Sequence, residues 1–118
     1  MTLEDFNLFC ASLPHTTTVV QWGGSHVWKI GGKVFAVAVW SVDERLAVSF
    51  KCSEMAFQML KQEAGLRPAP YLASRGMSWI QWQGPESMSF DELKDYVRAS
   101  YGLVAKGLTK AKQRELGF

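Results

Sequence analysis

The sequence predicts an α+β protein in which an antiparallel sheet carries helices packed on one of its faces. Strand-like segments follow one another between residues 17 and 52 and are joined by glycine pairs. Helix-like segments with capping signals stand before and after this run, and the strand–helix–strand alternation of a parallel sheet does not occur. A chain of 118 residues can bury one core, so we expect a single domain over residues 1–118.

Composition places the chain among ordinary globular proteins. Hydrophobic residues make up 47% of it and charged residues 20%. Apolar stretches are too short to span a bilayer, and Glu4 and Asp5 stand where a signal peptide needs positive charge. We therefore expect a cytoplasmic protein with no membrane partner. The net charge of +2 is too small to indicate a nucleic-acid partner by itself.

The first predicted helix spans residues 3–12. Thr2 and Asp5 have the spacing of a capping box, and Pro14 closes the segment because proline cannot continue a helix. The apolar residues recur at helical spacing: Leu3, Phe6, Phe9, Cys10 and Leu13.

Strands are predicted from residue 17 to residue 52. The segment 16–20 is β-branched, which favours the pleated conformation, and Gly31-Gly32 is typical of a tight hairpin. The segment 34–40 is apolar at both alternations, as in a central strand. The segment 45–52 alternates, with Leu46, Val48, Phe50 and Cys52 on one face and Arg45, Ala47, Ser49 and Lys51 on the other. We expect that second face to be wet or available for binding.

The rest of the chain alternates between helices and extended segments. Ser53 caps a second helix that stops near Gly65. Because Pro68 and Pro70 lack an N–H and fix φ, residues 67–72 form a rigid extended connector. A strand follows over about residues 77–83. A capping box at residues 89–92 opens a long third helix. A short, basic fourth helix is predicted to start at residue 109.

Several of these segments together resemble the MmcQ/YjbR family of small bacterial proteins over nearly the whole chain. The segments that carry the resemblance are Leu13-Pro14, Gln21-Trp22-Gly23, residues 27–36, residues 46–52, residues 67–72 with Trp79, and residues 101–104.

The resemblance implies a fold similar to frataxin and CyaY, and a DNA-binding protein with a double-wing arrangement. Members of the family often carry a longer polar stretch with a histidine after the connector. Here residues 73–78 read Ala-Ser-Arg-Gly-Met-Ser, so any role of that histidine is in doubt for this chain.

Tryptophans fall on predicted strands or at their ends: Trp22, Trp28, Trp40, Trp79 and Trp82. Aromatic side chains on an open sheet can stack on nucleic-acid bases, although in β-structure they more often fill the core. Trp79 and Trp82 are three residues apart on one strand, so they lie on opposite faces. We expect Trp79 to be the exposed one, since it neighbours the connector.

Basic residues could converge on the open face of the sheet and its rim: Lys29, Lys33, Arg45, Lys51, Arg67 and Arg75. Arginine suits bidentate contact with phosphate and lysine supplies a point charge, whereas solvated cations on strands also protect sheet edges. The rigid connector presents Arg67 and Tyr71 at little cost in ordering entropy. Alternatively, Tyr71 holds the connector on the sheet and Arg67 caps the preceding helix.

Catalytic and metal-binding patterns are missing from the sequence. Cys10, Cys52, His15 and His26 are isolated, whereas a structural metal site needs clustered ligands. The glycine pairs lack the spacing of phosphate-binding or dinucleotide-binding loops. We expect no enzyme, no metal and no cofactor.

The function we favour is binding of DNA through the basic, tryptophan-bearing side of the sheet, with phosphate contacts and weak sequence selectivity. The alternative is a domain without nucleic-acid affinity, whose sheet face binds a protein or a small ligand.

Overall fold

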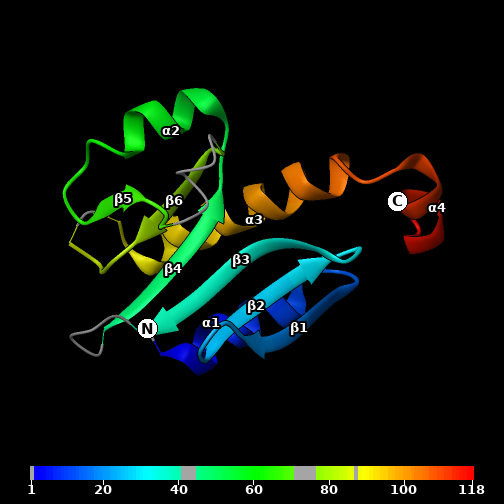
Figure 1. Ribbon diagram of the computed structural model, residues 1–118, viewed down its shortest axis with the longest axis horizontal. Coiled ribbons are helices and arrows are strands. Elements are labelled where there is room, and N and C mark those ends of the chain that lie inside the picture. The colour runs from blue at the N-terminus through cyan, green and yellow to red at the C-terminus, as the bar shows by residue number, and fades with distance from the viewer. Residues whose placement is uncertain (1, 41–44, 71–76, 87) are drawn as a thin grey trace.

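The structure is a computed structural model that describes residues 2–40, 45–70, 77–86 and 88–118. The chain order is shown in Figure 1. The elements are α1 (Leu3–Ser12), β1 (Thr16–Gln21), β2 (Ser25–Ile30), β3 (Lys33–Trp40), β4 (Leu46–Lys51), α2 (Glu54–Leu60), β5 (Leu66–Pro68), β6 (Trp79–Trp82), α3 (Phe90–Lys106) and α4 (Lys110–Leu116).

The strands form a six-stranded sheet in the order β1-β2-β3-β4-β6-β5. All neighbouring strands are antiparallel, which confirms the predicted α+β class. The structure adds one strand to the prediction: the first residues of the connector pair with β6 as β5. Pro68 is compatible with this position because β5 is an edge strand, where a missing N–H costs no ladder bond.

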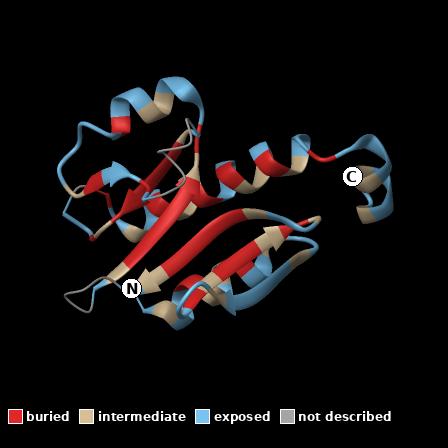
Figure 2. Cartoon of the chain, viewed as in Figure 1, coloured by how far each residue is buried: buried red, intermediate tan, exposed pale blue. Residues whose placement is uncertain are grey.

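Helices α1 and α3 pack on one face of the sheet, which we call the helix-covered face. Its core joins Phe6 and Cys10 of α1 and Leu93 and Val97 of α3 with apolar side chains from the strands. These strand residues are Trp28, Ile30, Phe35, Ala36, Ala38, Val48, Phe50, Leu66, Ile80 and Trp82. Figure 2 shows that β3, β4 and β6 are mostly buried, whereas β1 is mostly exposed.

Side-chain caps start the helices where the sequence predicted them. The Thr2 N–H donates to Asp5 Oδ2 at 3.0 Å, and the Asp5 N–H donates to Thr2 Oγ1 at 3.1 Å, which completes the capping box. Thr2 holds the pKa of Asp5 below its ordinary value. The larger cause is the hydrogen bond from the Thr2 backbone, and the smaller is that from the Thr2 side chain. Ser53, Ser89 and Thr109 cap the later helices.

The β2–β3 hairpin is fixed against the end of α3. Gly31 has φ of 60°, and a Cβ at this position would lie 2.7 Å from Leu108 Cδ1. A larger residue here would have to displace the Leu108 side chain and adopt a φ that favours glycine. The register between the two strands shifts between Trp28 and Lys29. Next to this bulge, Ser100 of α3 donates to the Phe35 carbonyl at 2.7 Å and accepts the Lys51 N–H at 2.9 Å.

Among the described residues, none of the helices has the length and apolar character needed to cross a membrane.

Candidate nucleic-acid interface

The second face of the sheet, which we call the outer face, points away from α1 and α3. The register sets six residues in one row across it: Val19, Val27, Val37, Ser49, Gln81 and Arg67. The centre of the row is buried. Val27 and Val37 are buried too, but on the outer face, since they do not belong to the helix-covered core. At the β5 end, Arg67 Nε donates to Gln81 Oε1 at 2.8 Å. The row thus passes from apolar side chains to a positioned guanidinium.

The prediction of a wet outer face for β4 is wrong at its centre. Ala47 and Ser49 are buried, and the accessible side chains of this predicted face stand at its two ends, at Arg45 and Lys51. Alternation along one strand fixes which residues share a face, but it does not fix whether that face is covered. The outer face has a buried, neutral centre, and its cations lie around that centre.

The expectation that Trp79 is exposed is also wrong, since only 3% of its surface is accessible. It does lie on the outer face, opposite Lys51 on β4, while Trp82 lies in the helix-covered core. Within the described part of the chain, Trp79 Nε1 has no hydrogen-bond acceptor. Trp79 cannot act as a stacking platform in this conformation.

Four of the eight predicted site residues share the outer face: Lys29, Lys51, Arg67 and Trp79. Lys33 stands opposite Ile30, a residue of the helix-covered core, so the register places it on the other side of the sheet. Arg45 precedes β4, and its guanidinium lies 3.2 Å from Glu86 in an exposed ion pair. Tyr71 and Arg75 lie outside the described residues.

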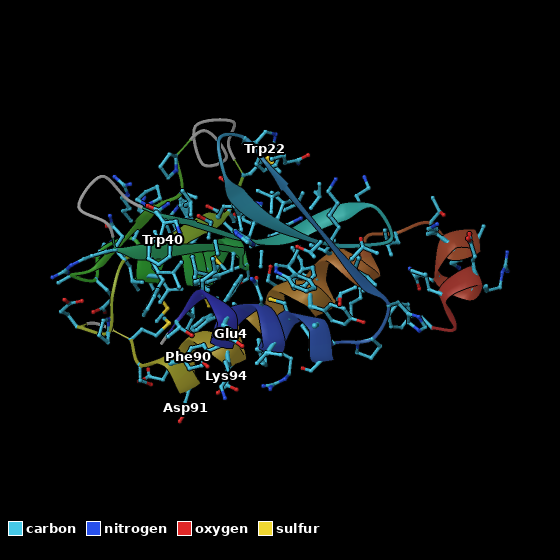
Figure 3. All side chains as sticks on the ribbon, turned by 90° about the horizontal axis from the view of Figure 1, so that it is seen from below. Glu4, Trp22, Trp40, Phe90, Asp91 and Lys94 are labelled. Atoms are coloured by element: carbon cyan, nitrogen blue, oxygen red, sulfur yellow. The ribbon has the colours of Figure 1, made fainter. Side chains whose placement is uncertain are left out.

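Exposed tryptophans are found elsewhere on the sheet. Trp22, in the β1–β2 turn, is 63% exposed, and Trp40, at the end of β3, is 54% exposed. Figure 3 shows Trp22 on the side of the sheet away from Lys94 of α3. Trp22 has φ of 53° and precedes two glycines, so an aromatic residue inside a glycine turn was the sequence signal that could have identified it.

The charges of the chain separate by element. The six strands contain four Lys or Arg residues (Lys29, Lys33, Lys51 and Arg67) and no Asp or Glu. They carry +4 and the rest of the chain carries −2, which together give the net charge of +2. Among the described residues, every Asp and Glu therefore lies on a helix or a connecting segment. A modest net charge conceals a sheet that is purely cationic.

The cysteines are buried and protonated at neutral pH. Burial raises the pKa of Cys10, and burial together with the nearby Glu54 raises the pKa of Cys52 to about 11. A protonated thiol is neither a good nucleophile nor a metal ligand. Groups of three His, Cys, Asp or Glu side chains that could hold a metal ion do not occur among the described residues.

Comparison with known proteins places this fold in a family. The model of the YjbR family matches residues 11–103. The chain belongs to the YjbR family. This assignment confirms the resemblance seen in the sequence.

Solved structures of similar proteins share the fold. The Deinococcus radiodurans protein DR2400, a DUF419 domain, superposes with a TM-score of 0.81 and 26% identity over 99% of this chain and 88% of its own. A Pseudomonas syringae protein superposes with a TM-score of 0.72 over 87% of this chain and 98% of its own. Its identity of 17% shows a common fold alone. No curated protein matches the chain.

Proposed function

We propose that this YjbR-family protein binds DNA through the outer face of its sheet. The observation that carries the proposal is the charge separation: the strands hold cations and no carboxylate. Phosphates approaching the outer face would meet Lys29, Lys51 and Arg67 without repulsion from a neighbouring acid on the sheet. Such contacts fix the position of the backbone and carry little sequence information.

Trp22 supplies the aromatic contact in this proposal. Its indole is exposed in a tight turn, so it can stack on an unpaired base without reorganising the core. A duplex keeps its bases stacked on one another and gains nothing from this contact. We therefore expect Trp22 to matter for single-stranded DNA and the outer-face cations to matter for both forms.

The alternative is that the outer face binds a protein or a small ligand without phosphate contacts. The observation that favours it is the neutral centre of the face, where Trp79 Nε1 is a buried donor with no acceptor among the described residues. A ligand that supplied an acceptor would satisfy this group, which otherwise costs stability.

Fluorescence-anisotropy titrations of labelled duplex and single-stranded DNA over a salt series separate the two functions. Three phosphate contacts predict a slope of log K against log [salt] of about −2.7 for a duplex, at about −0.9 per contact. The double variant Lys51→Gln/Arg67→Gln should reduce this slope to about −0.9. Trp22→Ala should weaken binding of single strands only.

The matched control is Lys94→Gln/Arg98→Gln, which removes the same charge from α3 on the helix-covered side, where both side chains lie over the Phe9 ring. If the control lowers the slope as much as the outer-face variant does, binding depends on net charge and not on this face. Absence of binding to either DNA at low salt would contradict the proposal and favour the alternative.

A further inference from the structure

The two edges of the sheet differ in their protection against pairing with another chain. β5 has three residues, of which Arg67 is charged and Pro68 has no N–H to donate. Both features discourage strand addition. β1 has six residues, Thr16–Gln21, with no charge and no proline, and its pairing with β2 continues without a bulge. Of the two edges, β1 is therefore the one that can accept a further strand.

The outer backbone groups of β1 are available for such a strand. Alternate residues of an antiparallel strand point both their N–H and their C=O away from the neighbouring strand. β1 is the last strand on its side, and within the described residues these groups have no partner from another strand. An extended peptide would gain a ladder of hydrogen bonds there.

An apolar groove of about 620 Å³ runs beside this edge, between α1 and β1. Leu8 of α1 and Val20 of β1 border it, and they are 64% and 58% exposed. Trp28 of β2 also lines the groove but is buried. An apolar side chain of an added strand could bury itself here, where the protein now exposes large hydrophobic residues to water.

The groove also contains a polar group with a defined direction. Trp28 Nε1 donates to Asn7 Oδ1 at 2.9 Å, which fixes the orientation of the Asn7 amide. Asn7 Nδ2, 3.4 Å from His26 Nδ1, is then the donor of that pair. With Nδ1 as the acceptor, the tautomer of His26 that fits this contact carries its proton on Nε2, which can donate to a carbonyl of a bound peptide.

The charge beside the groove selects the partner. Glu4 is the charged residue among the described lining residues, and it forms no ion pair within the described part of the chain. α1 carries Glu4 and Asp5 and no Lys or Arg. A second copy paired through β1 would bring two acidic α1 helices to the same side of one continuous sheet. A basic peptide would instead complement Glu4.

We propose that β1 and the groove beside α1 form a docking site for an extended, basic peptide segment of a partner protein. The segment adds as a seventh strand along β1. One apolar side chain enters the groove between Leu8 and Val20, and a lysine or arginine lies near Glu4. This site is separate from the outer-face cations, so it stands whether or not the protein binds DNA.

Labelled hexapeptides and NMR test the site on the intact chain. The probes are the hexapeptide Thr-Lys-Thr-Ile-Thr-Lys, in which the lysines and the isoleucine share one face, its counterpart with glutamate in place of lysine, and two N-methylated forms of the lysine peptide, methylated at odd or at even residues. The lysine peptide should bind in the micromolar range and shift the amide signals of Thr17–Gln21. The glutamate peptide should bind at least tenfold more weakly, and one methylated form should lose binding while the other keeps it.

Two lysine substitutions give a matched pair of variants. Leu8→Lys and Met55→Lys both replace an exposed apolar side chain on a helix, and only Leu8 borders the groove. Leu8→Lys should reduce binding at least tenfold and Met55→Lys should leave it unchanged.

Failure of the lysine peptide to bind at millimolar concentration would overturn the proposal. Equal binding of both methylated forms, or equal effects of the two lysine variants, would also do so. A dimer in sedimentation with protected β1 amides would assign the edge to a second copy instead.

Discussion

Trp82 and Trp79 lie three residues apart on β6 and are almost equally buried, yet they differ in the hydrogen bonding of their indole N–H groups. On the helix-covered face, Trp82 packs in the core and its Nε1 donates to the Met88 carbonyl at 2.8 Å. On the outer face, Trp79 Nε1 has no acceptor among the described residues. The helix-covered face uses its polar groups to hold the fold, whereas on the outer face the Trp79 donor and the charges of Lys29 and Lys51 have no partner among the described residues. We therefore expect stability to depend on the first face and binding on the second.

The largest expected effect is that of Phe50→Ala on the helix-covered face. Phe50 is fully buried and its ring lies 5.4 Å from that of Tyr96 on α3. Truncation to alanine removes this packing and leaves a cavity, so the free energy of unfolding should fall by about 3–5 kcal/mol. Urea denaturation measures the loss. A decrease below about 1 kcal/mol would show that the core is not centred on this face.

Ser100→Ala should have the next largest effect. The substitution leaves the Phe35 carbonyl and the Lys51 N–H without their bonds to Ser100, so stability should fall by about 2–3 kcal/mol. Hydrogen exchange of the Lys51 amide should accelerate as well, because this amide loses its acceptor. Ser12→Ala, at an exposed serine, is the control and should change stability by less than about 0.5 kcal/mol. Equal effects of the two variants would rule out the bridging role of Ser100.

Phenylalanine substitutions at the two tryptophans of β6 test the comparison directly. Trp82→Phe removes the donor to Met88 and leaves a buried carbonyl, so it should cost about 1–3 kcal/mol. Trp79→Phe removes a donor that has no acceptor among the described residues, and the cost should be at least about 1 kcal/mol smaller. Paired denaturation curves give this difference. Equal losses would mean that Trp79 Nε1 is satisfied in solution.

The smallest expected effect on stability is that of Lys51→Gln/Arg67→Gln. Lys51 is half-exposed and Arg67 exposed, and the loss is confined to the hydrogen bond from Arg67 to Gln81. Unfolding free energy should change by no more than about 1 kcal/mol, while the salt dependence of DNA binding falls. Thermal denaturation beside the anisotropy titrations checks this. A larger loss of unfolding free energy would instead show that these two cations stabilise the fold.

Local signals in the sequence predicted the elements correctly. Thr2, Ser53, Ser89 and Thr109 cap helices as expected, because a cap depends on residues within one turn of the helix start. The opposite orientation of Trp79 and Trp82 also follows from the geometry of one strand.

Features that depend on pairing between distant segments could not be predicted from the sequence. β5 forms only because β6 lies beside it, and the row from Ser49 through Gln81 to Arg67 depends on the same pairing. Periodicity within a segment carries no information on which strand becomes its neighbour. The burial of Trp79 was mispredicted for this reason, since exposure was inferred from proximity in sequence to the connector.

The position of β6 between β4 and β5 has a consequence for how the chain folds. Strands β1 to β4 form a meander in which each strand pairs with the next one along the chain, so these contacts close short loops. β5 precedes β6 in sequence but joins the sheet only through it. The edge strand Leu66–Pro68 can therefore pair only after residues 79–82 have paired with β4, which closes a longer loop. We expect the meander to form early and the Arg67 end of the outer face to be completed last.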